Sequence, residues 1–190
     1  GEAVHRTRSN KTFVFYDALP ISNFSLYFSK IISLIGVAAV LAFINIFIGV
    51  VFQLVSGYFS IDIVTYLIYN YGLVFPGFLT TILLAFFIHV LVNNKFLGHF
   101  IIVLLYVGLP LLVALVFKST NPLFIFGGTT PFFLSDLNGF GHYLTGITWL
   151  NLYWILFTLI LVIIGKAFWT RGFFSSAKER LYLAKKRFSV

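Results

Sequence analysis

The chain has 190 residues, of which 60% are hydrophobic and only 9% are charged. Soluble domains carry about 25% charged residues, so this composition excludes an ordinary soluble domain. The absence of cysteine also excludes disulfides, thiolate metal sites and thiol nucleophiles. The net charge of +8 would suit nucleic acid, but eleven of the thirteen basic residues lie before the first or after the last long apolar stretch. We therefore expect a lipid bilayer, and not nucleic acid, as the partner of this charge.

The first thirty residues are predicted to form a basic cytoplasmic region that ends in a short helix. The chain begins Gly1-Glu2, without Met, and we expect it to be a segment of a longer protein. Pro20 disfavours helical geometry in the residue before it, which places a boundary there. Helical spacing over 21–30 then predicts an amphipathic helix that lies along the inner membrane face, with Lys30 at the water line. Its apolar positions are Ile21, Phe24, Phe28 and Ile31.

Four long apolar stretches without Lys, Arg, Asp or Glu follow. Each has about 18 residues or more, which is enough to cross a hydrocarbon core of ~30 Å as a helix. A helix is required because lipid cannot satisfy a bare backbone. The sequence therefore predicts an all-α integral membrane protein with four transmembrane helices. The expected spans are 31–55, 74–92, 100–117 and 148–165.

The distribution of basic residues predicts the topology. An excess of Lys and Arg marks cytoplasmic segments, so both ends of the chain are expected inside the cell. The linker 56–73 has neither Lys nor Arg and is expected outside the cell. Lys95 lies in the hairpin that is expected inside. Lys118 is expected outside, which runs against the trend. This divides the chain into a cytoplasmic region (1–30), a transmembrane region (31–168) and a basic cytoplasmic tail (169–190) that leads to a further region.

Polar residues and prolines within the spans carry separate expectations. Asn45 and Gln53 lie in the first span and should face other helices. The second span should begin near Pro76, where a missing N–H costs little. Pro110 should kink the third span or leave a carbonyl group free.

The segment 119–146 is expected on the outer side. Its short apolar runs cannot span a bilayer, yet the phenylalanines in them would be poorly placed in water. It is therefore predicted either to dip into the membrane as a re-entrant pair or to pack on the bundle as an outer cap. The phenylalanines concerned are Phe124, Phe126, Phe132 and Phe133.

The densest polar cluster near the membrane lies between the second and third spans. His89 and Asn93 are one helical turn apart and share a face, and Lys95 and His99 are similarly spaced; Asn94 lies between the pairs. A metal site would need about three ligands, with a carboxylate or a second close histidine. No acidic residue is near in sequence, so we interpret the cluster as a polar clamp at a tight hairpin.

A second polar cluster lies in the outer segment. Asp136, Asn138 and His142 invite an acid–base interpretation. Turn hydrogen bonds on a glycine-rich loop explain Asp136 and Asn138 without chemistry. We expect this cluster to be structural, with side chains bonded to the backbone of the cap. No catalytic, cofactor-binding or metal-binding residue is predicted, and the chain is not expected to be an enzyme.

The energy source for any transport must lie outside the spans. Within the four predicted spans, His89 is the one titratable side chain apart from tyrosine. Membrane enzymes and proton-coupled carriers, by contrast, place ionisable groups within their spans. A permease driven by a separate ATPase needs no such groups.

The N-terminal region resembles a pattern in type 2 ABC exporter permeases. The matching residues are GEAV (1–4), Arg6 and Arg8, DALPIS (17–22) and Lys30 ahead of a span, although Thr7-Arg8 stands where that family often has Glu-Arg. Three further stretches are similar to permease halves fused to a zinc aminopeptidase domain in large bacterial proteins. They are FFIHVLVNNKFLGHF (86–100), SDLNGFGHY (135–143) and WTRGFFSSAKERLYLAKKR (169–187).

The resemblance implies the last four helices of a six-helix permease unit in a bacterial inner membrane. It also implies an ABC ATPase subunit that contacts a coupling helix, a second permease unit, and a peptidase that would lie beyond Val190. Asp17, Pro20, Phe24 and Lys30 are the coupling candidates. Two alternatives stay open: a membrane anchor or scaffold for a fused peptidase or other domain, and a membrane-embedded enzyme.

Overall fold

The computed structural model describes most of the chain, and its described residues are predominantly helical. They are 4–5, 20–92, 94–118, 121–135 and 137–169. The helical elements of the spans are α3 (Asn23–Val55), α4 (Ile63–Leu67), η1 (Ile68–Val74), α5 (Phe75–Leu91), α6 (Lys95–Val103), η2 (Leu104–Gly108), α7 (Leu109–Val116) and α8 (Gly141–Phe168). A short 3-10 turn, η3, covers Pro122–Phe124. These segments form four continuous helices long and apolar enough to cross a membrane, as expected.

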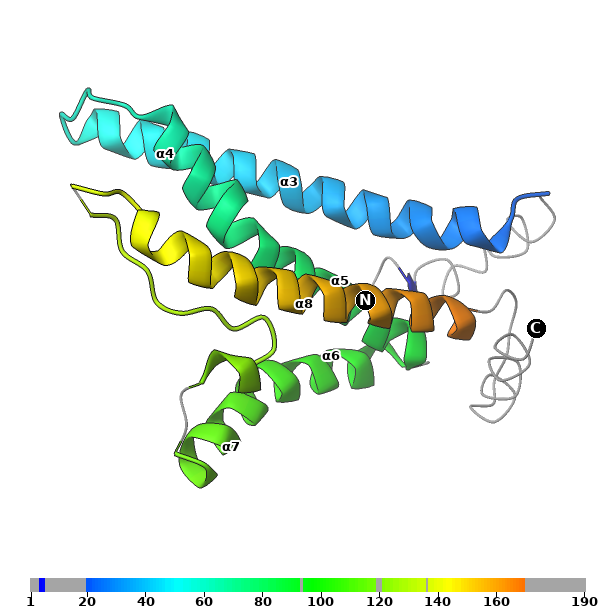
Figure 1. Ribbon diagram of the computed structural model, residues 1–190. Coiled ribbons are helices and arrows are strands. Elements are labelled where there is room, and N and C mark those ends of the chain that lie inside the picture. Colours follow the sequence, from blue (N-terminus) through cyan, green and yellow to red (C-terminus); the bar gives the residue numbers. More distant parts are fainter. Residues whose placement is uncertain (1–3, 6–19, 93, 119–120, 136, 170–190) are drawn as a thin grey trace.

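The first helix is longer than predicted. Ser22 caps it, because its Oγ accepts a hydrogen bond from the Ser25 N–H at 3.1 Å. From there α3 runs without interruption to Val55, as Figure 1 shows. The surface helix expected over 21–30 is therefore not a separate element but the first turns of α3. Its 33 residues correspond to about 50 Å, well beyond the ~30 Å of a hydrocarbon core.

The second helix also begins earlier than predicted. The segment Ile63–Leu91 is continuous, so most of the linker expected over 56–73 is helical. Asp62 starts this helix, since its carboxylate accepts hydrogen bonds from the N–H groups of Val64 and Thr65.

Two wide π-helical turns lie just before prolines. The turn η1 ends at Val74, two residues before Pro76, and η2 ends at Gly108, two residues before Pro110. A proline ring clashes with the carbonyl group four residues earlier, and a wider turn moves that carbonyl aside. The third helix changes direction between α6 and α7 (Figure 1), in line with the kink expected at Pro110.

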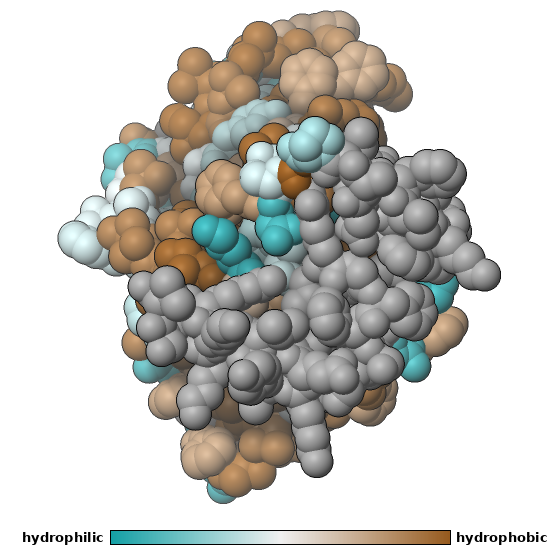
Figure 2. Space-filling model, turned by 90° about the vertical axis from the view of Figure 1, so that its right-hand side faces the viewer, coloured by the Kyte–Doolittle hydropathy of each residue, from teal (hydrophilic) through white to brown (hydrophobic). Residues whose placement is uncertain are grey.

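The helices pack around α5. Its most extensive contact is with α8, and α3 and α6 lie against its other sides. The main core lies at the end of the bundle where α3 begins and α8 ends. It contains Val4, Tyr27, Ile31, Leu83, Phe86, Val90 and Val162. Seen from that end, apolar residues cover most of the coloured upper, left and lower margin, and some hydrophilic residues lie near the middle (Figure 2).

Candidate functional site

At the end of the bundle where α3 begins and α8 ends, a buried side chain joins the two helices. The ring of Tyr27 is fully buried, and its hydroxyl donates a hydrogen bond to the carbonyl oxygen of Val162 at 2.8 Å. Gly165, on the same face of α8, leaves room for that hydroxyl, because a Cβ atom there would lie 2.7 Å from the oxygen. Sequence reasoning missed Tyr27, although it lies one turn before the predicted face residue Ile31.

Two lysines lie over aromatic rings beside this contact. Lys166 Nζ is 4.8 Å from the ring centre of Phe24, and Lys30 Nζ is 5.6 Å from that of Trp169. Phe24 is still 52% exposed, whereas Tyr27 and Ile31 are buried. Of the four coupling candidates, Pro20, Phe24 and Lys30 therefore lie at or near one exposed helix end, and Asp17 lies outside the described residues.

The hairpin cluster brings histidines together. His89 is buried, its ring centre lies 4.6 Å from that of His99, and the backbone of Gly98 lies directly against it. His5 approaches His89 from the N-terminal region, with ring centres 5.5 Å apart, and sequence reasoning did not predict this contact. Neither ring nitrogen of His89 has a hydrogen-bond partner in the described part of the chain.

The other hairpin residues have different surroundings. Asn94 caps α6 by accepting a hydrogen bond from the Phe96 N–H at 2.9 Å, and Lys95 Nζ lies 5.4 Å from the Phe96 ring centre. Asn93 lies outside the described residues. Among the residues that the structure describes, no group of three or more potential ligands is arranged for a metal ion. The local chemistry is thus ring packing and helix capping.

A row of hydrogen bonds joins α3 to the second helix. Asn45 donates to the Asn70 side chain at 3.0 Å, and Tyr66 donates to Gln53 at 2.7 Å. Gln53 in turn donates to the Ser60 carbonyl at 2.9 Å. Asn45 and Gln53 therefore contact another helix, as predicted. Their partners were missed because 63–73 was expected to be a loop.

The segment predicted to lie on the outer side, which we call the outer segment (121–135 and 137–140 as described), reaches the middle of the bundle. The ring of Phe126 lies 4.8 Å from Trp154 and 6.3 Å from Tyr106, centre to centre. A Cβ atom at Gly127 would lie 3.2 Å from Thr80 Oγ1. Thr80, Tyr106 and Trp154 each lie near the midpoint of their own long helix. Phe126 is partly buried there, whereas Phe124 and Phe133 are mostly exposed.

The cluster expected in the outer loop is organised differently from the prediction. His142 lies in the first turn of α8, is exposed, and contacts the Tyr143 ring. The turn closes through backbone bonds between Ser135 and Gly139, at 2.9 and 2.8 Å, because Gly139 adopts a φ of +55°. The Asn138 carbonyl accepts the Gly141 N–H, and Asp136 lies outside the described residues.

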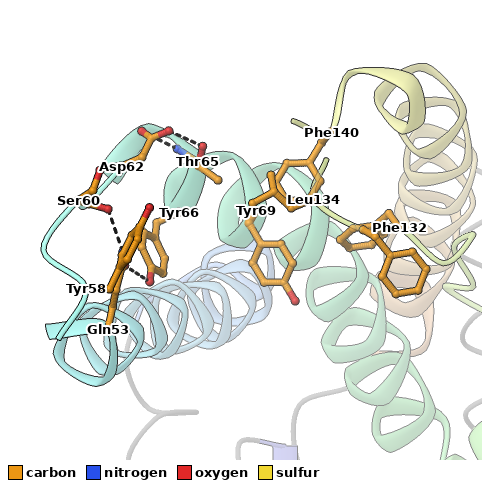
Figure 3. A pocket seen from close by; sticks show the side chains of 11 residues that line it. Gln53, Tyr58, Ser60, Asp62, Thr65, Tyr66, Tyr69, Phe132, Leu134 and Phe140 are labelled. Carbon is orange, nitrogen blue, oxygen red and sulfur yellow. Dashed lines mark hydrogen bonds between the residues drawn. The ribbon is translucent and has the colours of Figure 1, made fainter. Parts of the chain in front are cut away.

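A cavity of about 570 Å³ opens at this same end of the bundle, between the second helix and the outer segment. We call it the outer cavity, because the outer segment forms one of its sides. Figure 3 shows aromatic side chains on both of its sides and the Asp62 carboxylate at its edge. The residues that line it are Gln53, Tyr58, Ser60, Asp62, Thr65, Tyr66, Tyr69, Phe132, Phe133, Leu134 and Phe140.

Comparison with known proteins gives no relative for this chain: no family model, no curated protein and no solved structure matches it.

Proposed function

We propose that this chain is the membrane-spanning part of an ABC-type permease, which moves a substrate across the membrane with energy from a separate ATPase subunit. The observation that carries the proposal is the exposed start of α3, where Phe24 and Lys30 lie beside a buried tyrosine bonded to α8. A partner that moved this helix end would move α8 with it.

The lack of acidic residues within the described spans supports an external energy source. Among the described residues Asp62 is the single carboxylate, and it lies at the start of the second helix, outside the apolar stretch. Proton-coupled carriers use acidic residues within their spans. ATP hydrolysis in a separate subunit does not need them.

The proposal includes an orientation and an assembly. Both chain ends lie in the cytoplasm of a bacterial cell, the start of α3 extends past the inner edge of the bilayer, and substrate passes between two such units. The segment 121–135 re-enters the membrane from outside, which would explain why Phe126 packs among mid-helix residues.

The test is co-purification of an ATPase. The full chain is isolated from its native membranes with a mild detergent, and bound subunits are labelled with a photoreactive ATP analogue. We expect a labelled partner, and we expect Phe24→Asp to lose it. Phe59→Asp is the matched control, since Phe59 is also strongly exposed but lies just beyond the other end of α3. A chain that purifies without any labelled subunit would favour a membrane anchor.

A further inference from the structure

The walls of the outer cavity are aromatic. Tyr58 and Tyr66 form one side, and Tyr69, Phe132 and Phe140 form the other (Figure 3). The hydrogen bond from Tyr66 to Gln53 and the burial of Phe140 hold two of these rings in place. A volume of about 570 Å³ lies within the usual range of small-molecule sites, which is roughly 300–1,000 Å³.

The charge of the cavity is opposite to that of the chain. Among the residues that the structure describes, Asp62 is the one charged residue in the lining and no Lys or Arg contributes to it, although the protein as a whole carries a net charge of +8. Hydrogen bonds from Thr65 lower the pKa of this carboxyl below its ordinary value, so Asp62 is ionised at neutral pH. Three hydrogen bonds from Val64 and Thr65 leave part of the carboxylate available to a ligand.

We propose that the outer cavity binds an organic ammonium cation with an apolar body, such as a quaternary amine. Aromatic rings attract cations through the negative electrostatic potential over their faces, and cages of such rings recognise quaternary ammonium groups. A single carboxylate at the rim completes the charge. An anion would meet that carboxylate without a basic partner, and an inorganic cation would find too few oxygen ligands. This inference is independent of the transport proposal.

The probe is benzyltrimethylammonium, titrated into the full chain in the non-ionic detergent dodecyl maltoside and followed by calorimetry. We expect saturable binding at one site. Neopentylbenzene, the uncharged carbon analogue, should bind at least threefold more weakly. Equal affinity for the two molecules would overturn the proposal, because it would mean that the cavity recognises apolar volume and not charge.

Two substitutions locate the site without disturbing the fold. Asp62→Asn removes the charge but keeps a residue that caps helices well, and Tyr58→Leu removes an exposed ring. Each should weaken binding about threefold to fivefold, as expected for exposed ion pairs and cation–π contacts. Tyr153→Leu is the control, since Tyr153 is similarly exposed and does not line the cavity. Unchanged binding in both cavity variants would place the cation elsewhere and refute the assignment.

The same cation could reach the cavity as a lipid headgroup or as a free molecule. Competition with diheptanoyl phosphatidylcholine, added at equal detergent concentration, separates these sources. Displacement of the probe by this lipid assigns the cavity to choline headgroups. Retention of the probe assigns it to a free organic cation.

Discussion

The hydroxyl of Tyr27 donates a hydrogen bond to the carbonyl oxygen of Val162, and this contact ties the beginning of α3 to the last turns of α8. The two helices can approach because Gly165 presents no side chain to the phenol. Small residues have this role at helix contacts within membranes, where close packing replaces the hydrophobic driving force.

Gly165→Ala should therefore destabilise the bundle. The added Cβ would lie 2.7 Å from the Tyr27 oxygen and 3.1 Å from the Phe87 ring, so one of these groups must move. We expect a loss of about 1–3 kcal/mol in the free energy of unfolding, measured by titration of detergent-solubilised protein with sodium dodecyl sulfate. Gly146→Ala in the same helix meets no atom within 4 Å and should be neutral or slightly stabilising. Equal losses in both variants would contradict the contact.

Tyr27→Phe tests the hydrogen bond itself. Val162 keeps its helical backbone partner, so we expect a loss of only about 1 kcal/mol in the free energy of unfolding. Without the hydroxyl, the alanine at 165 has more space, and Gly165→Ala should cost less in this background than in the natural chain. Additive losses in the double variant would show that the two sites do not interact.

The four spanning helices could be predicted because charge-free apolar runs of this length have few other folds open to them. The residues at which these helices begin and end could not be predicted. The segment 63–73 has the tyrosines, asparagine and glycine of a loop, and only tertiary contacts such as Asn45–Asn70 explain why it is helical. The signal that could have placed the start is Asp62, a good capping residue three positions before Thr65.

The functional residues were less accessible to sequence reasoning. His89 and His99 could be assigned to one polar cluster because a tight hairpin links their helices, but the direct contact between their rings was not predicted. The hydrogen bond from Tyr27 to Val162 could not be predicted, since the acceptor is a backbone carbonyl group and every residue has one. The outer cavity also depends on how the outer segment returns to the second helix, and helical periodicity does not specify that path.

A comparison of alanine substitutions at Gly127 and Gly139 can distinguish the effect of backbone strain from that of packing in the outer segment. Both have positive φ, at +67° and +55°, so alanine is strained at either position. Only at Gly127 would the Cβ also press on Thr80, in the middle of the bundle. Gly127→Ala should therefore release the segment around Phe126 and speed thermolysin cleavage near 127–128. Gly139→Ala should leave cleavage at that site unchanged, and equal acceleration would indicate strain alone.

The carboxylate of Asp62, which caps the second helix, should titrate below its ordinary pKa. Hydrogen bonds from Thr65 and Val64 lower its pKa below the ordinary value of 3.8 in the folded protein. Its stabilising contribution is therefore present at neutral pH and is lost as the pH falls through that lowered pKa. The amide resonances of Val64 and Thr65 should shift with a midpoint below 3.8, and Asp62→Asn should abolish the shift. A midpoint at or above 3.8 would show that the carboxylate does not cap the helix.

The orientation in the membrane can be tested by cysteine labelling, because the natural chain contains no cysteine. Ser60 follows the end of α3. Phe96 lies in the first turn of α6, at the hairpin on the opposite side of the bundle, with 74% of its surface exposed. If basic residues mark the cytoplasmic side, Ser60→Cys should react with a membrane-impermeant maleimide applied to intact cells. Phe96→Cys should react only after the membrane is permeabilised. The opposite pattern would invert the topology, and it would move the start of α3 away from any cytoplasmic ATPase.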